Sequence, residues 1–422
     1  MLILLTGATG FIGSHLAQAL MAKGHHVLAA GRQPCRDERI GFIPADFAHD
    51  TEKAVWMARL KGVDVVINAV GIFREGAGQE FSALHRDAPS ALFQACAEVG
   101  MRYVVQVSAL GADAGAVTAF HTSKREADDA LAALPLSAAI VQPSLVYGED
   151  GASARMFRLL ATLPFHVRFG DAPQMVQPVH IDDVTAAICT LVVAMPPGVQ
   201  RLALVGPQPM PFAAYIAELR RALGLPRHPV LRLPRGVAVA AAWLSARLPG
   251  SPLDPDALSM LERGNTADPA PLARLLGRPP KAVRNFIARP TAERRMAQLD
   301  WLLPLLRASL AAVWIWTAYV SAFAYPLQDS YALLARTGIP AALAPLMLYG
   351  ASALDLAFGI GTLAWPRRTR RWLWLGQAIL IAFYSVVIAW RLPEFLLHPY
   401  GPLSKNLPML AAIWMLYELE KE

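Results

Sequence analysis

Two patterns of apolar residues divide the chain. Up to about residue 290, short apolar runs such as Met1–Leu5 alternate with segments whose apolar positions have a helical period. This alternation predicts an α/β fold, a Rossmann-type doubly wound parallel sheet covered by helices. Beyond about residue 300 the apolar runs lengthen to the roughly 20 residues that cross a bilayer. The sequence therefore predicts a sheet fold with a small helical cap, followed by a four-helix transmembrane bundle.

Four apolar segments predict the bundle. They cover residues 302–325, 341–365, 372–392 and 406–419, and the last is short for a hydrocarbon core of about 30 Å. Arginines cluster before the first segment and in "RRTRR" between the second and third, which places both sites on the cytoplasmic side. We therefore expect a multi-pass protein of the inner (cytoplasmic) membrane, with both termini and the nucleotide-binding domain in the cytoplasm.

Asp355 lies inside the second apolar segment. A carboxyl group is costly there, so a functional role is the default hypothesis. Ala351, Ser352 and Gly359 share its helical face, so it would turn toward neighbouring helices. The alternative is a structural hydrogen bond between helices. Candidate partners are Tyr319, Tyr384, Lys405 and Asn406.

Composition and charge agree with this division. Of 422 residues, 55% are hydrophobic and 17% charged, and the formal net charge is +7. Because the arginines stand beside the apolar segments, we expect the lipid bilayer as a partner and no nucleic acid. Cys35, Cys96 and Cys189 lack metal-ligand spacing and predict reduced thiols and no metal site. The apolar start is too short for a signal peptide.

The turn after the first strand carries glycine at every third position, Gly7, Gly10 and Gly13. In a strand–turn–helix unit these glycines permit a tight turn, the approach of a pyrophosphate, and close packing of helix on strand. The helix beginning near Phe11 would direct its N-terminus, including Ile12, at the phosphates. We therefore expect this turn to bind a dinucleotide; the alternative is a tight turn without a ligand.

The second strand ends in Gly31 and Arg32, where an NAD site usually carries an acidic residue. An arginine can pair with a 2′-phosphate, so we expect NADP, with NAD as the alternative. A solvated arginine at a strand end is the structural alternative. Ligands of such folds bind at the carboxyl ends of the strands. The residues at or just after those ends are Gly7, Arg32, Asp46, Asn68, Gly71, Ser108 and Pro143.

Residues 1–290 resemble the extended or atypical short-chain dehydrogenase/reductase superfamily. The motifs that carry the resemblance are "TGATGFIG", "VSALGAD", the Ser-Lys helix, "QPSLVYG" and "QPVHIDDV". Together with "LPGSPLDPDALSMLERGN", they are most similar to the branch that includes the accessory subunit of respiratory complex I. The resemblance implies that residues 1–150 bind NAD(P) and that residues 151–292 complete the domain as a substrate or cap region.

The resemblance also implies roles for single residues. Ser108 and Lys124 would be catalytic, and Lys124 would hold the nicotinamide ribose. Asp46 would lie near the adenine, and the loop that starts at Pro143 and Ser144 would back the nicotinamide. The sequence departs from the family at Phe120, where active members have tyrosine.

Phe120 cannot donate a proton, so hydride-transfer chemistry is in doubt. His121 is one substitute, although it lies about 100° around the helix from Phe120. Tyr147 is another, unless it is a packed loop aromatic. Within the cap, Pro234–Gly250 would lie on a membrane surface or pack against the domain.

Residues 300–420 resemble the DoxX-like family of small membrane proteins, in "YGASALDLAFGIG" and "GPLSKNLPML". The family implies a link to a quinone or another lipophilic small molecule, and a membrane protein partner. Two functions follow. The chain is a cofactor-binding membrane protein linked to quinone or lipid-phase redox metabolism, or it is an active NADPH-dependent oxidoreductase acting on a quinone or lipophilic carbonyl compound.

Overall fold

The computed structural model describes residues 1–76, 78–169, 173–227, 229–233, 236–237, 240, 243, 255–399 and 401–420. The chain forms two compact units, Met1–Ala297 and Gln298–Glu422. The proposed interfacial segment Pro234–Gly250 lies largely outside the described residues.

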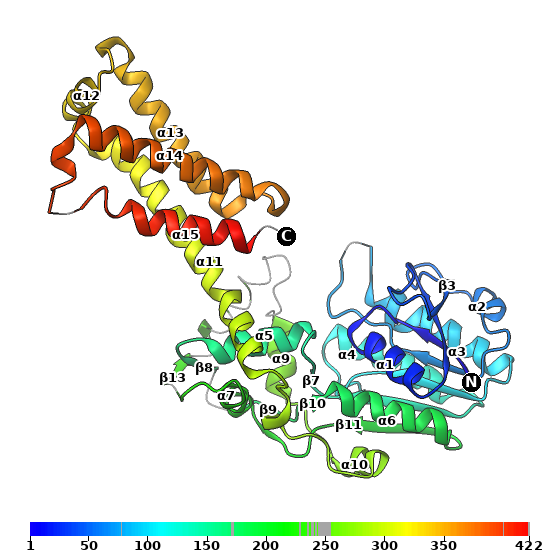
Figure 1. Ribbon diagram of the computed structural model, residues 1–422. Helices are drawn as coiled ribbons and strands as arrows, with labels where there is room; N and C mark the ends of the chain where they lie inside the picture. The colour runs from blue at the N-terminus through cyan, green and yellow to red at the C-terminus, as the bar shows by residue number, and fades with distance from the viewer. Residues whose placement is uncertain are drawn as a thin grey trace. The chain divides into compact units, whose positions relative to one another are not determined.

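The first unit is built on a seven-stranded sheet in the order β11-β6-β5-β4-β1-β2-β3 (Figure 1). All of its strand pairings are parallel. The strands are β1 (Leu2–Thr6), β2 (His26–Gly31), β3 (Gly41–Pro44), β4 (Val65–Asn68), β5 (Tyr103–Val107), β6 (Ala138–Pro143) and β11 (Val199–Leu204). The order reverses between β1 and β4, which is where doubly wound sheets bind ligands. The predicted fold is confirmed.

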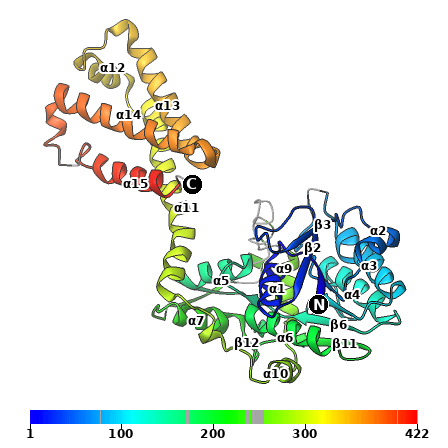
Figure 2. The same ribbon diagram turned by 45° about the vertical axis from the view of Figure 1, so that its right-hand side comes forward.

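Helices cover both faces of this sheet (Figure 2). One face packs against α1 (Phe11–Ala22), α6 (Ile181–Ala194) and α10 (Ala270–Leu276). The other packs against α2 (Lys53–Arg59), α3 (Ala88–Glu98) and α4 (Ala119–Ala132). The strands are apolar at successive positions because neighbouring side chains enter opposite cores, as Leu4 and Leu5 do. Each fully buried leucine stabilises the fold by about 1.5–3 kcal/mol.

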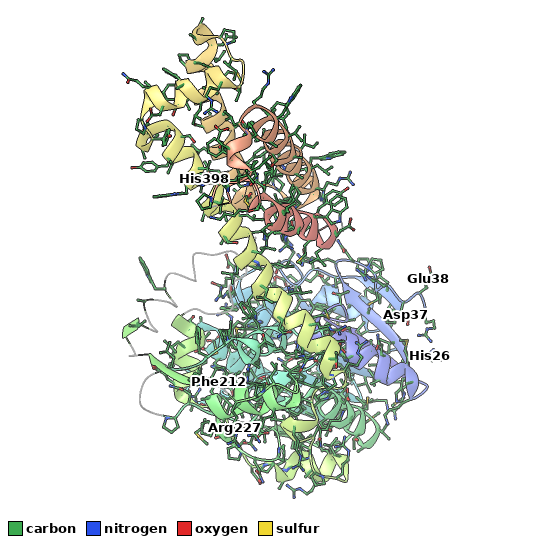
Figure 3. The ribbon with its side chains drawn as sticks, turned by 60° about the vertical axis from the view of Figure 1, so that its left-hand side comes forward. His26, Asp37, Glu38, Phe212, Arg227 and His398 are labelled. Carbon is green, nitrogen blue, oxygen red and sulfur yellow. The ribbon has the colours of Figure 1, made fainter. Side chains whose placement is uncertain are left out.

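A smaller core follows the sheet. It contains α5 (Ala152–Thr162), α7 (Phe212–Ala222) and three two-stranded pairings. Those pairings are β7 (Val146–Tyr147) with β10 (Val179–His180), β8 (His166–Phe169) with β13 (Val230–Leu233), and β9 (Met175–Val176) with β12 (Met210–Pro211). Its aromatic centre includes Tyr147, Phe157 and Phe212, the last at the start of α7 (Figure 3). α9 (Pro255–Arg263) completes the region. The sequence predicted short helices here and missed the strand pairs, which are two to four residues long.

The second unit is helical. Its helices are α11 (Pro290–Tyr319, which begins in the first unit), α12 (Leu327–Arg336), α13 (Ala344–Ala364), α14 (Arg370–Arg391) and α15 (Asn406–Leu419). Among the described residues, three helices are long and apolar enough to cross a membrane, where four spans were predicted. The prediction fails at α15, whose 14 residues extend about 21 Å, against about 30 Å of hydrocarbon. α12 was not predicted.

The outer surface of this unit is apolar. Trp390 is 78% exposed, and Ile379, Phe383 and Val386 of the same helix are also exposed. Water would be a poor solvent for such a surface, whereas a bilayer suits it. Polar groups turn inward instead, and the buried Gln377 bridges two of the long helices to its own. It accepts a hydrogen bond from Trp314 Nε1 (2.9 Å) and donates to Thr362 Oγ1 (2.8 Å).

Candidate functional site

The glycine-rich turn has no room for side chains at two of its three glycines. Gly7 has a φ of 70°, and a Cβ there would lie 2.5 Å from Ala69 O. A Cβ at Gly13 would lie 2.1 Å from Gly7 O. At Gly10 the nearest atom is also Gly7 O, but at 3.2 Å. The fold therefore requires glycine at 7 and 13, whereas position 10 is constrained less by the protein itself.

The N-terminus of α1 is open to a ligand. Its N-cap is Gly10, no side chain caps the helix, and the first turn carries no acidic residue. The helix therefore keeps a positive end with free backbone N–H donors, which suits a phosphate. The Phe11 ring packs against Gly148, where an added Cβ would lie 2.8 Å from it. Ile12 packs against the core, so these two residues offer backbone groups only.

A pocket opens at the carboxyl ends of β1, β2 and β4. Five predicted residues line it: Gly7, Gly10, Arg32, Asp46 and Gly71. The other predicted residues lie outside its lining: Phe11, Ile12, Gly13, Asn68, Ser108, Lys124, Pro143 and Ser144. Gln79 and Leu84, from the segment after β4, also line the pocket, and no pattern in the sequence indicated either residue.

Arg32 and Asp46 sit at the open part of this pocket. The Gln79 amide oxygen accepts from both terminal nitrogens of Arg32, at 2.7 Å each. Asp46 accepts hydrogen bonds from Ala48 N (3.0 Å) and from His49 Nδ1 (3.1 Å). Burial works to raise the pKa of Asp46, but these hydrogen bonds and the Arg32 charge outweigh it and hold that pKa below its usual value. The pocket thus presents one cation and one carboxylate.

Asn68 is a brace beneath the pocket. Its Oδ1 accepts from Thr6 Oγ1 (2.6 Å), and its Nδ2 donates to Gln106 Oε1 (2.7 Å). All three side chains are fully buried and come from the three neighbouring strands β1, β4 and β5. Because a buried polar group must be satisfied, this chain fixes the strand ends in register. Thr6 and Gln106 were missed, although a polar residue inside an apolar strand was a usable signal.

Ser108 is held by the protein. Its hydroxyl donates to Asp128 Oδ2 at 2.5 Å, and Gln142 Nε2 donates to the same oxygen at 3.4 Å. Asp128 is fully buried, and burial raises its pKa to about 6. Its other oxygen has no hydrogen-bond partner among the described residues. The Ser108 hydroxyl therefore points to an interior carboxyl group, which the sequence did not predict.

Lys124 is also engaged. Its ammonium donates to Val70 O (3.0 Å) and Val107 O (3.3 Å), at the ends of β4 and β5. Burial lowers its pKa to about 8, although the Asp128 carboxylate works in the opposite direction. A Cβ on Gly71 would lie 3.1 Å from the Lys124 Nζ, so glycine leaves room for the ammonium. The lysine lies behind the Gly71 backbone at the pocket wall.

His85 connects the pocket wall to α4, and the sequence did not single it out. Its Nε2 accepts from the Ile72 N–H (3.0 Å), so the neutral ring carries its proton on Nδ1 and donates to Ser123 Oγ (3.0 Å). Ser123 in turn donates to Phe120 O (3.0 Å). Burial, with the Lys124 charge, lowers the pKa of His85 to about 2. The chain of bonds fixes the loop after β4 against α4.

Phe120 belongs to an aromatic cluster. Its ring centroid lies 5.2 Å from that of Phe73, 6.1 Å from Phe81 and 5.6 Å from His85. Phe73 is half exposed, so the cluster has an open apolar side. His121 is buried, and its Nδ1 lies 3.2 Å from Thr118 Oγ1. Burial and the Arg263 charge lower the pKa of His121, which is therefore neutral at pH 7.

The loop after β6 is tied into the domain. Ser144 Oγ donates to Gln177 O at 2.5 Å, and Pro143 is the last residue of β6. Tyr147 is 1% exposed and donates to Glu293 Oε2 at 3.0 Å. Burial raises the pKa of the Tyr147 phenol, so this tyrosine is a packed aromatic rather than an available acid. Of the two roles considered for Tyr147, the structure favours the packed loop aromatic over the proton donor.

Comparison with known proteins divides the chain in the same way. Residues 3–200 match the NAD dependent epimerase/dehydratase family, and residues 311–414 match the DoxX-like family. The ceramide reductase of Caulobacter vibrioides is 30% identical over 193 residues, which are 44% of this chain and 59% of that protein. NADH dehydrogenase [ubiquinone] 1 alpha subcomplex subunit 9, mitochondrial, of Arabidopsis thaliana is 32% identical over 195 residues, 43% and 48% of the two chains. The chain thus spans about half the length of these relatives.

Solved structures show the same fold at low sequence identity. MoeE5 in complex with UDP-glucose and NAD has 21% identity and a TM-score of 0.52 over 71% of this chain and 99% of its own. UDP-glucuronic acid 4-epimerase from Bacillus cereus, in complex with UDP-glucuronic acid and NAD, has 20% identity and a TM-score of 0.51 over 71% and 100%. The chain therefore combines a domain of the NAD dependent epimerase/dehydratase family in its N-terminal part with a DoxX-like membrane domain in its C-terminal part.

Proposed function

We propose that this protein binds a nicotinamide dinucleotide between β1 and β4 and serves lipid-phase redox metabolism without tyrosine-dependent hydride transfer. The observation that carries the proposal is Phe120, whose ring packs in an aromatic cluster where active family members have the phenol. A positioned general acid typically contributes 10²–10⁴-fold to a rate. A site without one binds its cofactor but catalyses slowly.

Within this proposal, residues 1–150 hold the cofactor, residues 151–292 cap it, and residues 300–420 form the membrane domain. The backbone of Gly7, Gly10, Phe11, Ile12 and Gly13 faces the pyrophosphate, because α1 begins there without a cap. When bound in its reduced form, the dinucleotide would supply a hydride equivalent. The chain's own contribution would be to bind and orient it.

The remaining roles divide between the two ends of the cofactor. Asp46 lies at the adenine end, and Asn68 and Gly71 shape the wall between the ends. Ser108 and Lys124 sit behind the nicotinamide end, and the loop starting at Pro143 and Ser144 closes it. Because Arg32 lines the pocket beside the ribose position, we propose NADP as the preferred cofactor, with NAD as the weaker ligand.

A second candidate is an active NADPH-dependent reductase of a lipophilic carbonyl compound or a quinone. Its support is the 30% identity with a protein named ceramide reductase, together with the membrane domain. Such a reaction would need a proton from water or from His121, since Phe120 has none to give. A neutral His121 beside Thr118 is a weak acid, so the rate would depend little on it.

Location and partners follow from the same features. We propose that the protein lies in the inner (cytoplasmic) membrane, with its nucleotide-binding unit in the cytoplasm, because arginines cluster before α11 and in "RRTRR". A relative named as a subunit of NADH dehydrogenase supports a membrane protein partner. Reporter fusions near residues 330 and 398 should both score outside the cytoplasm. A cytoplasmic score at either position contradicts this orientation.

The experiment that tests the proposed function uses the full-length protein purified in detergent. Mass spectrometry should find a bound nicotinamide dinucleotide, whereas Gly10→Ala should purify without it. The loaded protein should consume little NADPH when offered ordinary ketones, a short-chain quinone or the keto form of a short-chain ceramide. Rapid consumption with any of them would establish the second candidate instead.

A further inference from the structure

The carboxyl group of Asp355 is buried in the membrane unit, and one of its oxygens lacks a partner among the described residues. Its side chain is 6% exposed, and its Oδ1 has no hydrogen bond among the described residues. The neighbouring Ser352 is satisfied within α13, since its hydroxyl donates to Leu348 O (2.9 Å). A structural bond between helices was the simplest explanation for this carboxyl, and the described residues provide none. An unpartnered buried carboxyl destabilises a membrane helix, which makes a ligand the stronger explanation.

The residues that the sequence suggested as hydrogen-bond partners of Asp355 make no hydrogen bond to it in the described part of the chain. Asn406 Nδ2 donates to Ser385 Oγ (2.8 Å), and the Tyr319 ring packs at a tilt against Trp316 with centroids 5.8 Å apart. Lys405 is exposed. Tyr384 remains, and it lies near enough to Asp355 for their charges to interact.

Helix register explains why Tyr384 is near. α13 and α14 form an antiparallel hairpin in which Gln377 bonds Thr362. Asp355 lies seven residues before Thr362, and Tyr384 lies seven residues after Gln377. Both are therefore about 10 Å from the Thr362–Gln377 bond, on the same side of it. The carboxyl and the phenol occupy one level of the bundle.

α15 begins at this level. Its far end is fixed where Glu420 contacts Arg370 (3.4 Å), and its first residue, Asn406, bonds Ser385. α14 continues six residues past Ser385 to Arg391, about 9 Å further. The backbone at the start of α15 is already paired, since Asn406 N donates to Leu403 O (3.1 Å) and Leu407 N donates to Ser404 O (3.3 Å). Among the described residues at this level, the buried atom that lacks a partner is Asp355 Oδ1, and an unpaired polar group at membrane depth requires one.

We propose that Asp355, Tyr384 and the Ser385–Asn406 pair form a binding site for the head group of a lipid-phase molecule. The carboxylate would accept from a hydroxyl of that head group, and the Tyr384 phenol would donate to a second oxygen. The short α15 leaves the site within the bundle rather than at its surface. A quinol and a hydroxylated amide lipid share this chemistry. The site belongs to the membrane unit, and the proposal is independent of the nucleotide pocket.

The test uses the full-length protein in phosphatidylcholine nanodiscs with two radiolabelled probes, a reduced short-chain ubiquinone and a short-chain ceramide. One of them should bind, and Asp355→Leu should weaken that binding at least tenfold. The matched control is Asp329→Asn, an exposed carboxyl of α12, which should bind as the natural protein does. Ubiquinol binding identifies a quinol as the source of the head group, and ceramide binding identifies a lipid.

A stability measurement separates this role from a structural one. Because the described residues offer Asp355 no hydrogen bond to lose, Asp355→Leu in the probe-free protein should leave the melting midpoint unchanged or raise it. NADPH affinity should not change. The proposal is overturned if neither probe binds the natural protein, if Asp355→Leu binds as well as the natural protein does, or if its melting midpoint falls sharply.

Discussion

The two ends of the proposed nucleotide site are built in opposite ways. At the phosphate and adenine end, the α1 N-terminus is uncapped, and Arg32 and Asp46 line open space. At the other end, Ser108, Lys124 and His85 are each bound to protein groups. Binding needs polar groups that are free to meet a ligand, and proton transfer needs a positioned acid. The first end offers a ligand the uncapped α1 N-terminus and two charged residues in the pocket lining, whereas the polar groups of the second lie outside that lining and hold strands and helices together.

Under the proposed function, the second end keeps its motif residues in structural roles. Ser108 and Lys124 are both present, so the motif appears nearly intact. The hydroxyl of one contacts the buried Asp128, and the ammonium of the other caps two strand ends. Each contact satisfies a buried polar group that would otherwise destabilise the fold. Both residues therefore have a structural reason to be there without catalysis.

The largest expected effect is at the phosphate end. Gly13→Ala places a methyl group where Gly7 O already lies, so the turn cannot form and binding should fall more than roughly a hundredfold, with a lower melting midpoint. Gly10→Ala is the matched comparison, because its nearest atom is 3.2 Å away. It should keep the melting midpoint and lose affinity, since its methyl group occupies phosphate space. Equal NADPH affinity in all three proteins contradicts the assignment.

Cofactor preference gives the next effect. Arg32→Ala removes one charge-assisted contact, worth about 1.5–3 kcal/mol, so NADPH should lose roughly ten- to a hundredfold in affinity. NADH should bind the variant as it binds the natural protein, because it lacks the 2′-phosphate. Titration of both cofactors against both proteins decides. An unchanged ratio of affinities would leave Arg32 as a solvated residue.

The end of the site that contains His85 should make the fold less stable in acid. The pKa of His85 falls from 6.5 in the unfolded chain to about 2 in the fold, so the folded ring resists protonation. Stability is then fully present above pH 6.5 and is lost as pH falls, by about 2 kcal/mol at pH 5. His85→Gln keeps an acceptor and a donor but does not titrate. Melting midpoints at pH 7.5 and 5 should differ less in the variant than in the natural protein.

The smallest effect concerns Gln79. Its oxygen holds the Arg32 guanidinium, so Gln79→Leu should free the arginine and reduce the preference for NADPH by about fivefold, the worth of one hydrogen bond of roughly 1 kcal/mol. Gln79→Glu should also reduce it, since a carboxylate would compete with the 2′-phosphate for the arginine. A preference that is unchanged in both variants would show that Arg32 needs no support.

The sequence predicted the fold and the tight glycine turn before α1 because both depend on local patterns. Apolar periodicity indicates strands and helices, and glycine spacing after a strand indicates a turn with a free helix N-terminus. The spacing also singled out Gly7 and Gly13, where the structure leaves no room for a Cβ. Local sequence carries such information because the turn's atoms are near one another in the chain.

The other end could not be predicted in the same way. Asp128, Gln142 and His85 meet Ser108 and Ser123 only after strands and helices distant in the chain have packed. No spacing in the sequence indicates such contacts. The fourth membrane span failed for a related reason: an apolar segment shows that a helix is buried in lipid, but the length of α15 depends on where its polar first residue finds a partner.

The proposed site binds its cofactor but lacks a general acid to donate the proton that carbonyl reduction needs. The most direct measurement is the rate of NADPH consumption by the full-length protein, loaded with NADPH and offered a keto ceramide, beside Phe120→Tyr. We expect the natural protein to keep its NADPH and the variant to consume it measurably faster, by at most about 10²-fold because Ser108 stays bound to Asp128. Brisk consumption by the natural protein, equal to that of the variant, would contradict the account.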